Sequence, residues 1–131
     1  MIALLLMTMA CTDKDPEIHE TADPGEPATF SEVRDEILLL SCAFSSCHGD
    51  QGAGDLTLSA ETAHEALVDI PSSDVPGETL VIPGNAAGSY LIKKLEEADG
   101  IAGDVMPPGS SLPDPKIETI RSWIDNGAQD D

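Results

Sequence analysis

Two thiols and an imidazole lie close together in the first half of the chain. Cys42 and Cys47 are separated by four residues, and His48 follows directly after the second cysteine. Such a group can attach a haem, because each thiol can add to a porphyrin vinyl group while the imidazole binds the iron; two residues between the cysteines is the usual spacing. The thiols can instead form a disulfide in an exported protein, or bind zinc with His64 as a fourth ligand. The motif favours haem but leaves all three kinds of chemistry open.

A predicted helix ends directly before this motif and has to position it. Thr29 and Glu32 form a capping box, in which the two side chains satisfy free backbone amides at the start of a helix. Apolar residues then recur at the spacing of one helix face, at Phe30, Val33, Ile37 and Leu40. The cysteines therefore follow a helix whose inner face is expected to be buried.

Three further helices are predicted along the rest of the chain. The second runs from Ser59 to Asp69, and the third opens at Asn85. The fourth has Asp114 as its N-cap and a proline at the first helical position, and it stops at Asn126 before a glycine. The connecting segments are long and rich in glycine and proline, and no strand pattern of useful length is seen. The sequence therefore predicts an all-α domain of about four helices with long loops.

The ordered set of motifs resembles the class I cytochrome c family. In that family an N-terminal helix precedes the cysteine and histidine site, a methionine lies on a proline-containing loop, and a final helix packs across the first. The matching residues here are the Cys42–His48 segment, Met106 with Pro107, and the 117–124 helix with Trp123. Closer still, the stretches VIPGNAAGSYLIKKL, MPPG and RSWIDNGA look like secreted cytochrome-c-like bacterial lipoproteins, which often have four residues between the cysteines. The resemblance covers about residues 30 to 128.

The resemblance implies a small cytochrome c-like domain wrapped around a haem c. Cys42 and Cys47 would hold the porphyrin, and the iron would be bound by His48 on one side and Met106, beside Pro107, on the other. A thioether ligand favours reduced iron and raises its potential. With both axial positions filled by the protein, the implied role is electron transfer rather than enzyme catalysis. Further candidates for the walls of the haem pocket are Pro83, Tyr90 and Leu91.

Three alternatives to an electron carrier stay open. One is a non-catalytic surface lipoprotein with a cytochrome-like fold but no haem, in which Cys42 and Cys47 form a disulfide. Another is a small binding module stapled by zinc. The third is a haem enzyme with an open iron, which requires that Met106 does not bind the iron. Within the haem interpretation, His64 could replace Met106 as the sixth ligand. Met106 could also simply fill a gap in the core, as methionine often does.

Charge and aromatic content narrow the possible partners and the makeup of the core. The 131 residues include 25 acidic and 6 basic side chains, which gives a formal net charge of −19. This excludes nucleic acid as a partner, because phosphate binding needs clustered Lys and Arg. It is suited to a redox partner with a basic docking face. The aromatic side chains that could fill the core are few, namely Phe30, Phe44, Tyr90 and Trp123. A cofactor could therefore supply part of the core.

The beginning of the chain predicts export and a lipid anchor. Residues 1–10 are apolar except for one threonine and too few to span a bilayer, which predicts a signal peptide. Cys11 follows in a stretch that resembles a bacterial lipobox, so it would carry the lipid; an ordinary signal peptide with an incidental cysteine is the alternative. Residues 11–29 would then be an acidic, disordered tether, before a domain over 30–128 and a tail over 129–131. The expected location is the periplasmic side of the outer membrane or the cell surface.

Overall fold

The computed structural model describes residues 25–131. The predicted signal peptide over 1–10, the lipid anchor at Cys11 and the tether up to residue 24 lie outside the described residues. None of the helices in the described part combines the length and apolar character needed to cross a bilayer. Extended segments there pair only in two isolated bridges, Val68 with Val81 and Pro71 with Thr79. The all-α prediction is therefore confirmed for residues 25–131.

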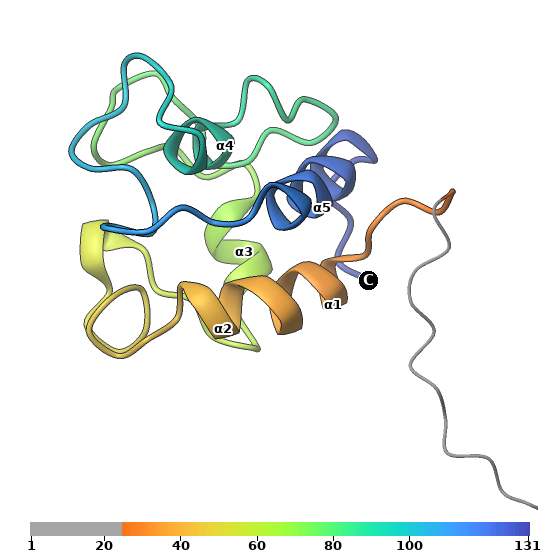
Figure 1. Ribbon diagram of the computed structural model, residues 1–131, viewed down its shortest axis with the longest axis horizontal. Helices are drawn as coiled ribbons and strands as arrows, with labels where there is room; N and C mark the ends of the chain where they lie inside the picture. Colours follow the sequence, from red (N-terminus) through yellow and green to blue (C-terminus); the bar gives the residue numbers. More distant parts are fainter. Residues whose placement is uncertain (1–24) are drawn as a thin grey trace, which may run out of the picture.

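The first helical segment is continuous and leads to the cysteine motif (Figure 1). It consists of α1 (Phe30–Glu32), a π-helical stretch η1 (Val33–Leu38) and α2 (Leu39–Ser41). The predicted capping box is confirmed: the Thr29 hydroxyl accepts from the Glu32 amide at 3.2 Å, and the Glu32 carboxylate accepts from the Thr29 amide at 2.9 Å. This cap fixes the residue at which the helix begins. The helix ends at Ser41, directly before Cys42.

The predicted inner face of this helix is correct for its first half and wrong at Leu40. Val33 and Ile37 are buried, but Leu40 is 62% exposed and Leu38 is 1% exposed. The Leu39 amide donates to the Arg34 carbonyl, five residues back, so this turn holds one residue more than an α-helical turn. The extra residue shifts the buried face along the chain.

The second and third predicted helices are shorter than predicted. After the short turn η2 (Ala53–Asp55), α3 covers Ala63–Leu67 rather than 59–69, and α4 covers Tyr90–Leu95 rather than starting near residue 85. The Ser59 hydroxyl instead accepts from the Thr62 amide at 3.2 Å, in the turn before α3. Beyond α3 the chain becomes extended and bonds to residues near Val81, which ends the helix early.

The last helix, α5 (Asp114–Asp125), packs against η1 and α4 (Figure 1). Pro113 is the N-cap, one residue before the predicted position, and Gly127 with φ of +104° follows the end of the helix. Trp123 is buried and its ring centroid lies 5.2 Å from that of Phe30, so the first and last helices meet in one core.

Residues 129–131 are bonded to the domain. The Phe30 amide donates to the Asp131 carboxylate at 2.7 Å, and the Ser31 amide donates to the Asp131 carbonyl oxygen at 2.9 Å. The Trp123 indole N–H donates to the Gln129 carbonyl at 2.8 Å. At the opposite end of the first helical segment, the loops that follow α2 and α4 lie near each other, on the left of Figure 1. That end of the molecule carries the predicted site.

Candidate functional site

A cavity of about 310 Å³ lies where these loops meet the helices, and all five predicted site residues line it. Cys42, Cys47 and His48 come from the segment after α2, whereas Met106 and Pro107 come from the loop between α4 and α5. Almost sixty positions separate the two groups in the sequence. The fold therefore brings the two predicted halves of the site to one cavity, whose volume falls at the lower end of the roughly 300–1,000 Å³ found for small-molecule sites.

The rest of the cavity wall is largely aliphatic. Ile70 is 38% exposed, one of few large apolar side chains so exposed. Tyr90 and Leu91 line the cavity as predicted, but Pro83 does not. The other leucines of the wall are Leu38, Leu56, Leu58, Leu67, Leu80 and Leu95. An apolar wall with two thiols, an imidazole and a thioether has the chemistry that a covalently held haem needs.

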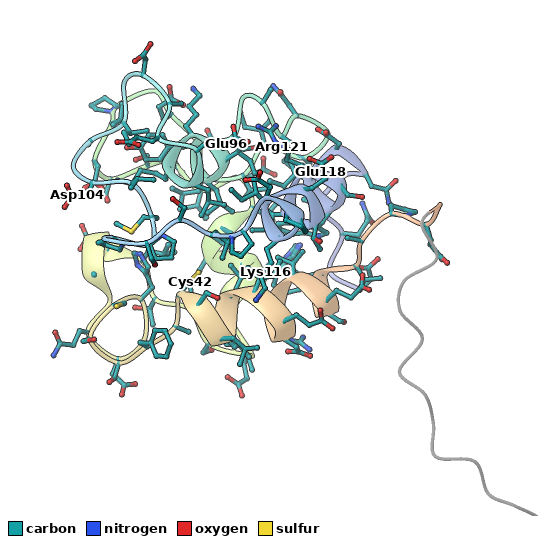
Figure 2. All side chains as sticks on the ribbon, viewed as in Figure 1. Cys42, Glu96, Asp104, Lys116, Glu118 and Arg121 are labelled. Atoms are coloured by element: carbon teal, nitrogen blue, oxygen red, sulfur yellow. The ribbon has the colours of Figure 1, made fainter. Side chains whose placement is uncertain are left out.

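The extra turn residue in η1 helps to aim the first cysteine at this cavity. Leu38 lines the cavity, and its carbonyl accepts from the Cys42 and Ala43 amides, both at 2.9 Å. With a regular α-helix the inner face would continue at Leu40, which instead faces solvent. Figure 2 shows Cys42 at the C-terminal end of the first helical segment, where the loop after α2 begins. The π-helical stretch was not predicted, although it sets the direction of the motif.

His48 has one ring nitrogen fixed by the backbone. Its Nδ1 lies 3.2 Å from the Leu56 carbonyl oxygen. A carbonyl can only accept, so Nδ1 donates, and a neutral ring would then have its free lone pair on Nε2. The His48 carbonyl accepts from the Leu58 amide at 2.6 Å, which holds the 48–58 loop closed around the ring. A neutral imidazole with a fixed Nδ1–H is the form that binds a metal through Nε2.

The loop between the two cysteines is compact and depends on a glycine. The Cys47 and Gly49 amides both donate to the Phe44 carbonyl, at 2.8 and 3.0 Å, and the His48 amide donates to the Cys42 carbonyl at 3.1 Å. A Cβ on Gly49 would lie 2.7 Å from the Ala43 carbonyl oxygen and 2.8 Å from that of Phe44. Gly49 was not predicted as part of the site. Its position directly after His48 is the feature of the sequence that could have identified it.

Both thiols of the motif are free, and Cys42 lies in a desolvating environment. Burial, and secondarily the neighbouring Cys47, raises the pKa of the Cys42 thiol to about 11, which the Lys116 ammonium counteracts in part. The neutral thiol is therefore the stable form at neutral pH.

His64 lies away from this cavity, in the core. Its Nε2 is 2.8 Å from the Ala128 carbonyl oxygen, and its ring packs against Phe30 and Trp123 at centroid distances of 5.0 and 6.1 Å. Within residues 25–131 no group of three or more His, Cys, Asp and Glu side chains is arranged to hold a metal. The suggested zinc set of Cys42, Cys47, His48 and His64 is therefore not brought together, nor does His64 compete with Met106 at the cavity.

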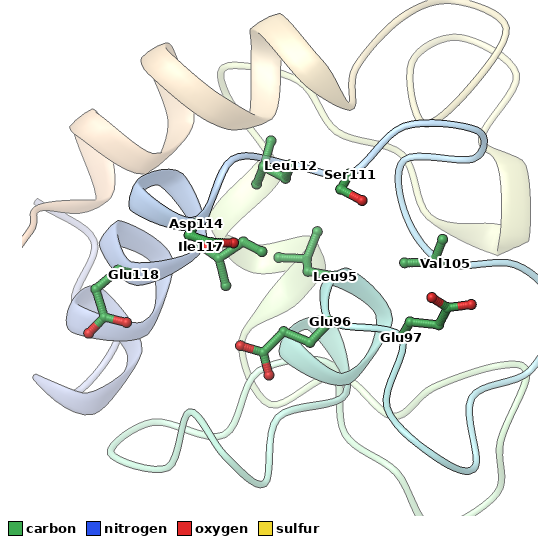
Figure 3. A pocket seen from close by; sticks show the side chains of 9 residues that line it. All are labelled: Leu95, Glu96, Glu97, Val105, Ser111, Leu112, Asp114, Ile117 and Glu118. Atoms are coloured by element: carbon green, nitrogen blue, oxygen red, sulfur yellow. The ribbon is translucent and has the colours of Figure 1, made fainter.

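A second cavity, of about 340 Å³, shares Leu95 with the first and has an acidic lining (Figure 3). Leu112 and Ile117 form apolar parts of its wall. Arg121 already binds one of its carboxylates, that of Glu96, at 3.1 and 2.5 Å. The carboxylates of this cavity belong to Glu96, Glu97, Asp114 and Glu118.

Comparison of the chain with protein-family models, curated proteins and solved structures gave no match. The functional argument therefore rests on the residues around the first cavity. These are two thiols, an imidazole with one fixed nitrogen and a thioether, all on an aliphatic wall.

Proposed function

We propose that the protein is a monohaem c-type cytochrome that transfers electrons and is not an enzyme. The observation that carries this proposal is the convergence of Cys42, Cys47, His48 and Met106 on one aliphatic cavity. Two of these side chains alone would suit several functions. The set of four matches what a covalently attached, six-coordinate haem c requires.

Each of the four side chains has a distinct role in the proposal. Cys42 and Cys47 would hold the porphyrin covalently, each S–H adding to a vinyl double bond with no net oxidation or reduction. His48 would bind the iron through Nε2, because its Nδ1 donates to the Leu56 carbonyl. Met106 would provide a thioether ligand, and Pro107 follows it in the cavity wall. Bound haem would supply a one-electron couple between ferrous and ferric iron.

Electron transfer follows from the ligands and from the cavity wall. Two protein ligands leave no open position at the iron for a substrate. Before haem is attached, burial raises the pKa of the Cys42 thiol to about 11, so Cys42 is not a thiolate ready to act as a catalytic nucleophile. The acidic surface would receive a basic redox partner, and a lipid on Cys11 would keep the domain at the periplasmic side of the outer membrane or the cell surface.

The absorption spectrum of protein made in a host that attaches haem c tests this function. We expect a red protein whose colour stays with the polypeptide after denaturation and solvent extraction. The double variant Cys42→Ser/Cys47→Ser should lose the colour on extraction, and Cys11→Ser should keep it. A colourless wild-type protein with a Cys42–Cys47 disulfide would refute the proposal in favour of a haem-free surface lipoprotein, and stoichiometric zinc would favour the zinc module.

A further inference from the structure

Lys94 is buried beside the first cavity and has no carboxylate partner among the residues that the structure describes. Its side chain is in the cavity wall and the residue is 9% exposed, although lysine is rarely buried. The ion pairs within residues 25–131 are Arg34–Asp35, Lys93–Glu78 and Arg121–Glu96. The Lys94 ammonium instead donates to two backbone carbonyls, those of Ala102 and Asp104, at 2.6 and 2.5 Å.

These two carbonyls belong to the loop that leads to Met106. The loop starts at the end of α4, and Figure 2 shows Asp104 on its outer side. Two more bonds tie it back to the helix: the Ala102 amide donates to the Tyr90 hydroxyl at 2.9 Å, and the Met106 amide donates to the Lys94 carbonyl at 2.8 Å. Lys94 thus holds the loop through its side chain and Met106 through its backbone.

Burial of an ammonium costs free energy, because carbonyl dipoles replace its hydration shell. Besides the bonds to α4, which include one from the Ala98 amide to the Lys93 carbonyl at 3.0 Å, the loop contains two glycines with positive φ, Gly100 and Gly103, and several charged residues that face solvent. The two hydrogen bonds of the Lys94 ammonium offset the free energy cost of its burial. They also fix the conformation of the segment that presents Met106 to the cavity.

We propose that Lys94 is a positioning residue that keeps Met106 in place as the sixth ligand, an inference that rests on the proposed haem function. Without the ammonium, the carbonyls of Ala102 and Asp104 lose their donor and the loop can leave α4. The iron would then keep His48 and lose Met106 for part of the time.

The test compares Lys94→Met with Lys93→Met in haem-loaded protein. Methionine keeps an unbranched apolar stem and removes the charge and its donors; Lys93 is the matched control, because its ammonium binds Glu78 instead, at 2.7 Å. Three quantities are measured: amide hydrogen exchange over residues 98–106, the affinity of ferric protein for imidazole as a competing iron ligand, and the reduction potential. Met106→Ala gives the reference for an iron without the thioether.

We expect Lys94→Met to speed exchange over 98–106 at least tenfold while exchange in α5 stays unchanged. Imidazole should bind at least tenfold more tightly than to wild type, and the potential should fall toward that of Met106→Ala. Lys93→Met should stay within twofold of wild type in exchange and imidazole affinity. If Lys94→Met lowers overall stability, Tyr90→Phe, which removes only the bond to the Ala102 amide, should shift the same quantities in the same direction by a smaller amount.

Two other results would overturn the inference, and they can be told apart. If Lys94→Met and Tyr90→Phe behave like Lys93→Met while Met106→Ala binds imidazole tightly, Lys94 has no positioning role and the haem function stands. If Met106→Ala itself binds imidazole no better than wild type, Met106 is not an iron ligand. That result removes the axial ligand of the proposed function and the role of Lys94 with it.

Discussion

At the scale of single residues, the site combines groups that are each held in one chemical form. The Leu56 carbonyl selects the tautomer of His48, and burial keeps Cys42 as a neutral thiol. The sequence motif identifies which residues take part. It does not reveal which nitrogen of His48 donates or how strongly Cys42 holds its proton. The first depends on a carbonyl eight positions further along the chain, and the second on the walls of the cavity.

The titration of Cys42 is testable in reduced protein made without haem attachment. A raised pKa means that the folded protein holds the thiol proton to higher pH than an unfolded chain does, so the thiolate and its reactivity are delayed. We expect the rate of Cys42 alkylation by iodoacetamide, followed by mass spectrometry of the digested protein, to rise with a midpoint near pH 11 in the folded state. In denaturant the midpoint should return to the ordinary thiol value of 9.0. A folded-state midpoint at or below that value would contradict the desolvated environment.

At the scale of elements, the helix and the loop around the motif fix its geometry together. The segment from α1 to α2 sets the position of Cys42, and the loop bonds to the Phe44 carbonyl set that of Cys47. Gly49 makes this loop possible, because its missing side chain lets two carbonyl oxygens approach. A change at Gly49 should therefore disturb the motif without changing any of its four functional side chains.

Substitution of Gly49 by Ala should lower the free energy of unfolding by about 1–3 kcal/mol, the usual cost of added volume in a filled site. The added Cβ would meet two carbonyl oxygens at 2.7 and 2.8 Å, and the cysteine loop would have to shift. Denaturant unfolding measures the change. Gly25→Ala is the matched control, since nothing lies within 4 Å of a Cβ there. Equal stabilities of the two variants would show that the loop adapts freely.

Much of the arrangement of elements follows from local sequence signals, and the remainder depends on tertiary contacts. The capping box at Thr29 and the stop at Asn126 are local, so they were predictable. The exposure of Leu40 was not, because one additional residue in a helical turn leaves no mark in the spacing of apolar residues. Likewise, the bonds of Lys94 join residues up to ten positions apart across a loop of unpredicted shape.

At the scale of the whole molecule, the core is divided between side chains and a cavity. Three of the four aromatic residues are buried, whereas Phe44 is 55% exposed. The aliphatic cavity of about 310 Å³ lies beside this small core. The low aromatic content of the sequence predicted that a cofactor could fill part of the interior, and the cavity has the position and lining for that role.

If the proposed haem fills this cavity, its removal should destabilise the fold. We expect protein made without haem attachment to unfold with a free energy lower by on the order of 3–5 kcal/mol than the haem-loaded form, the range for loss of a large buried side chain. Denaturant unfolding of the two forms gives the difference. The Cys42→Ser/Cys47→Ser variant, produced in both hosts, should show a smaller difference, because its haem is not held covalently. If the two wild-type forms were equally stable with haem attached, the cofactor would lie outside the core.

Under the proposed function, the charge of the whole chain determines which redox partners can approach. At −19, the protein attracts cations over a distance set by salt, about 30 Å at 0.01 M and 10 Å at 0.1 M ionic strength. We therefore expect electron transfer to a small cationic metal complex to slow by about tenfold or more between 0.01 and 0.5 M salt, within the range of electrostatic steering. An anionic complex of similar potential should react faster as salt rises. Stopped-flow absorption of the haem measures both rates. The two reagents differ in the sign of their charge. If both rates depended on salt in the same way, the acidic surface would not steer the reagents to the site of electron transfer.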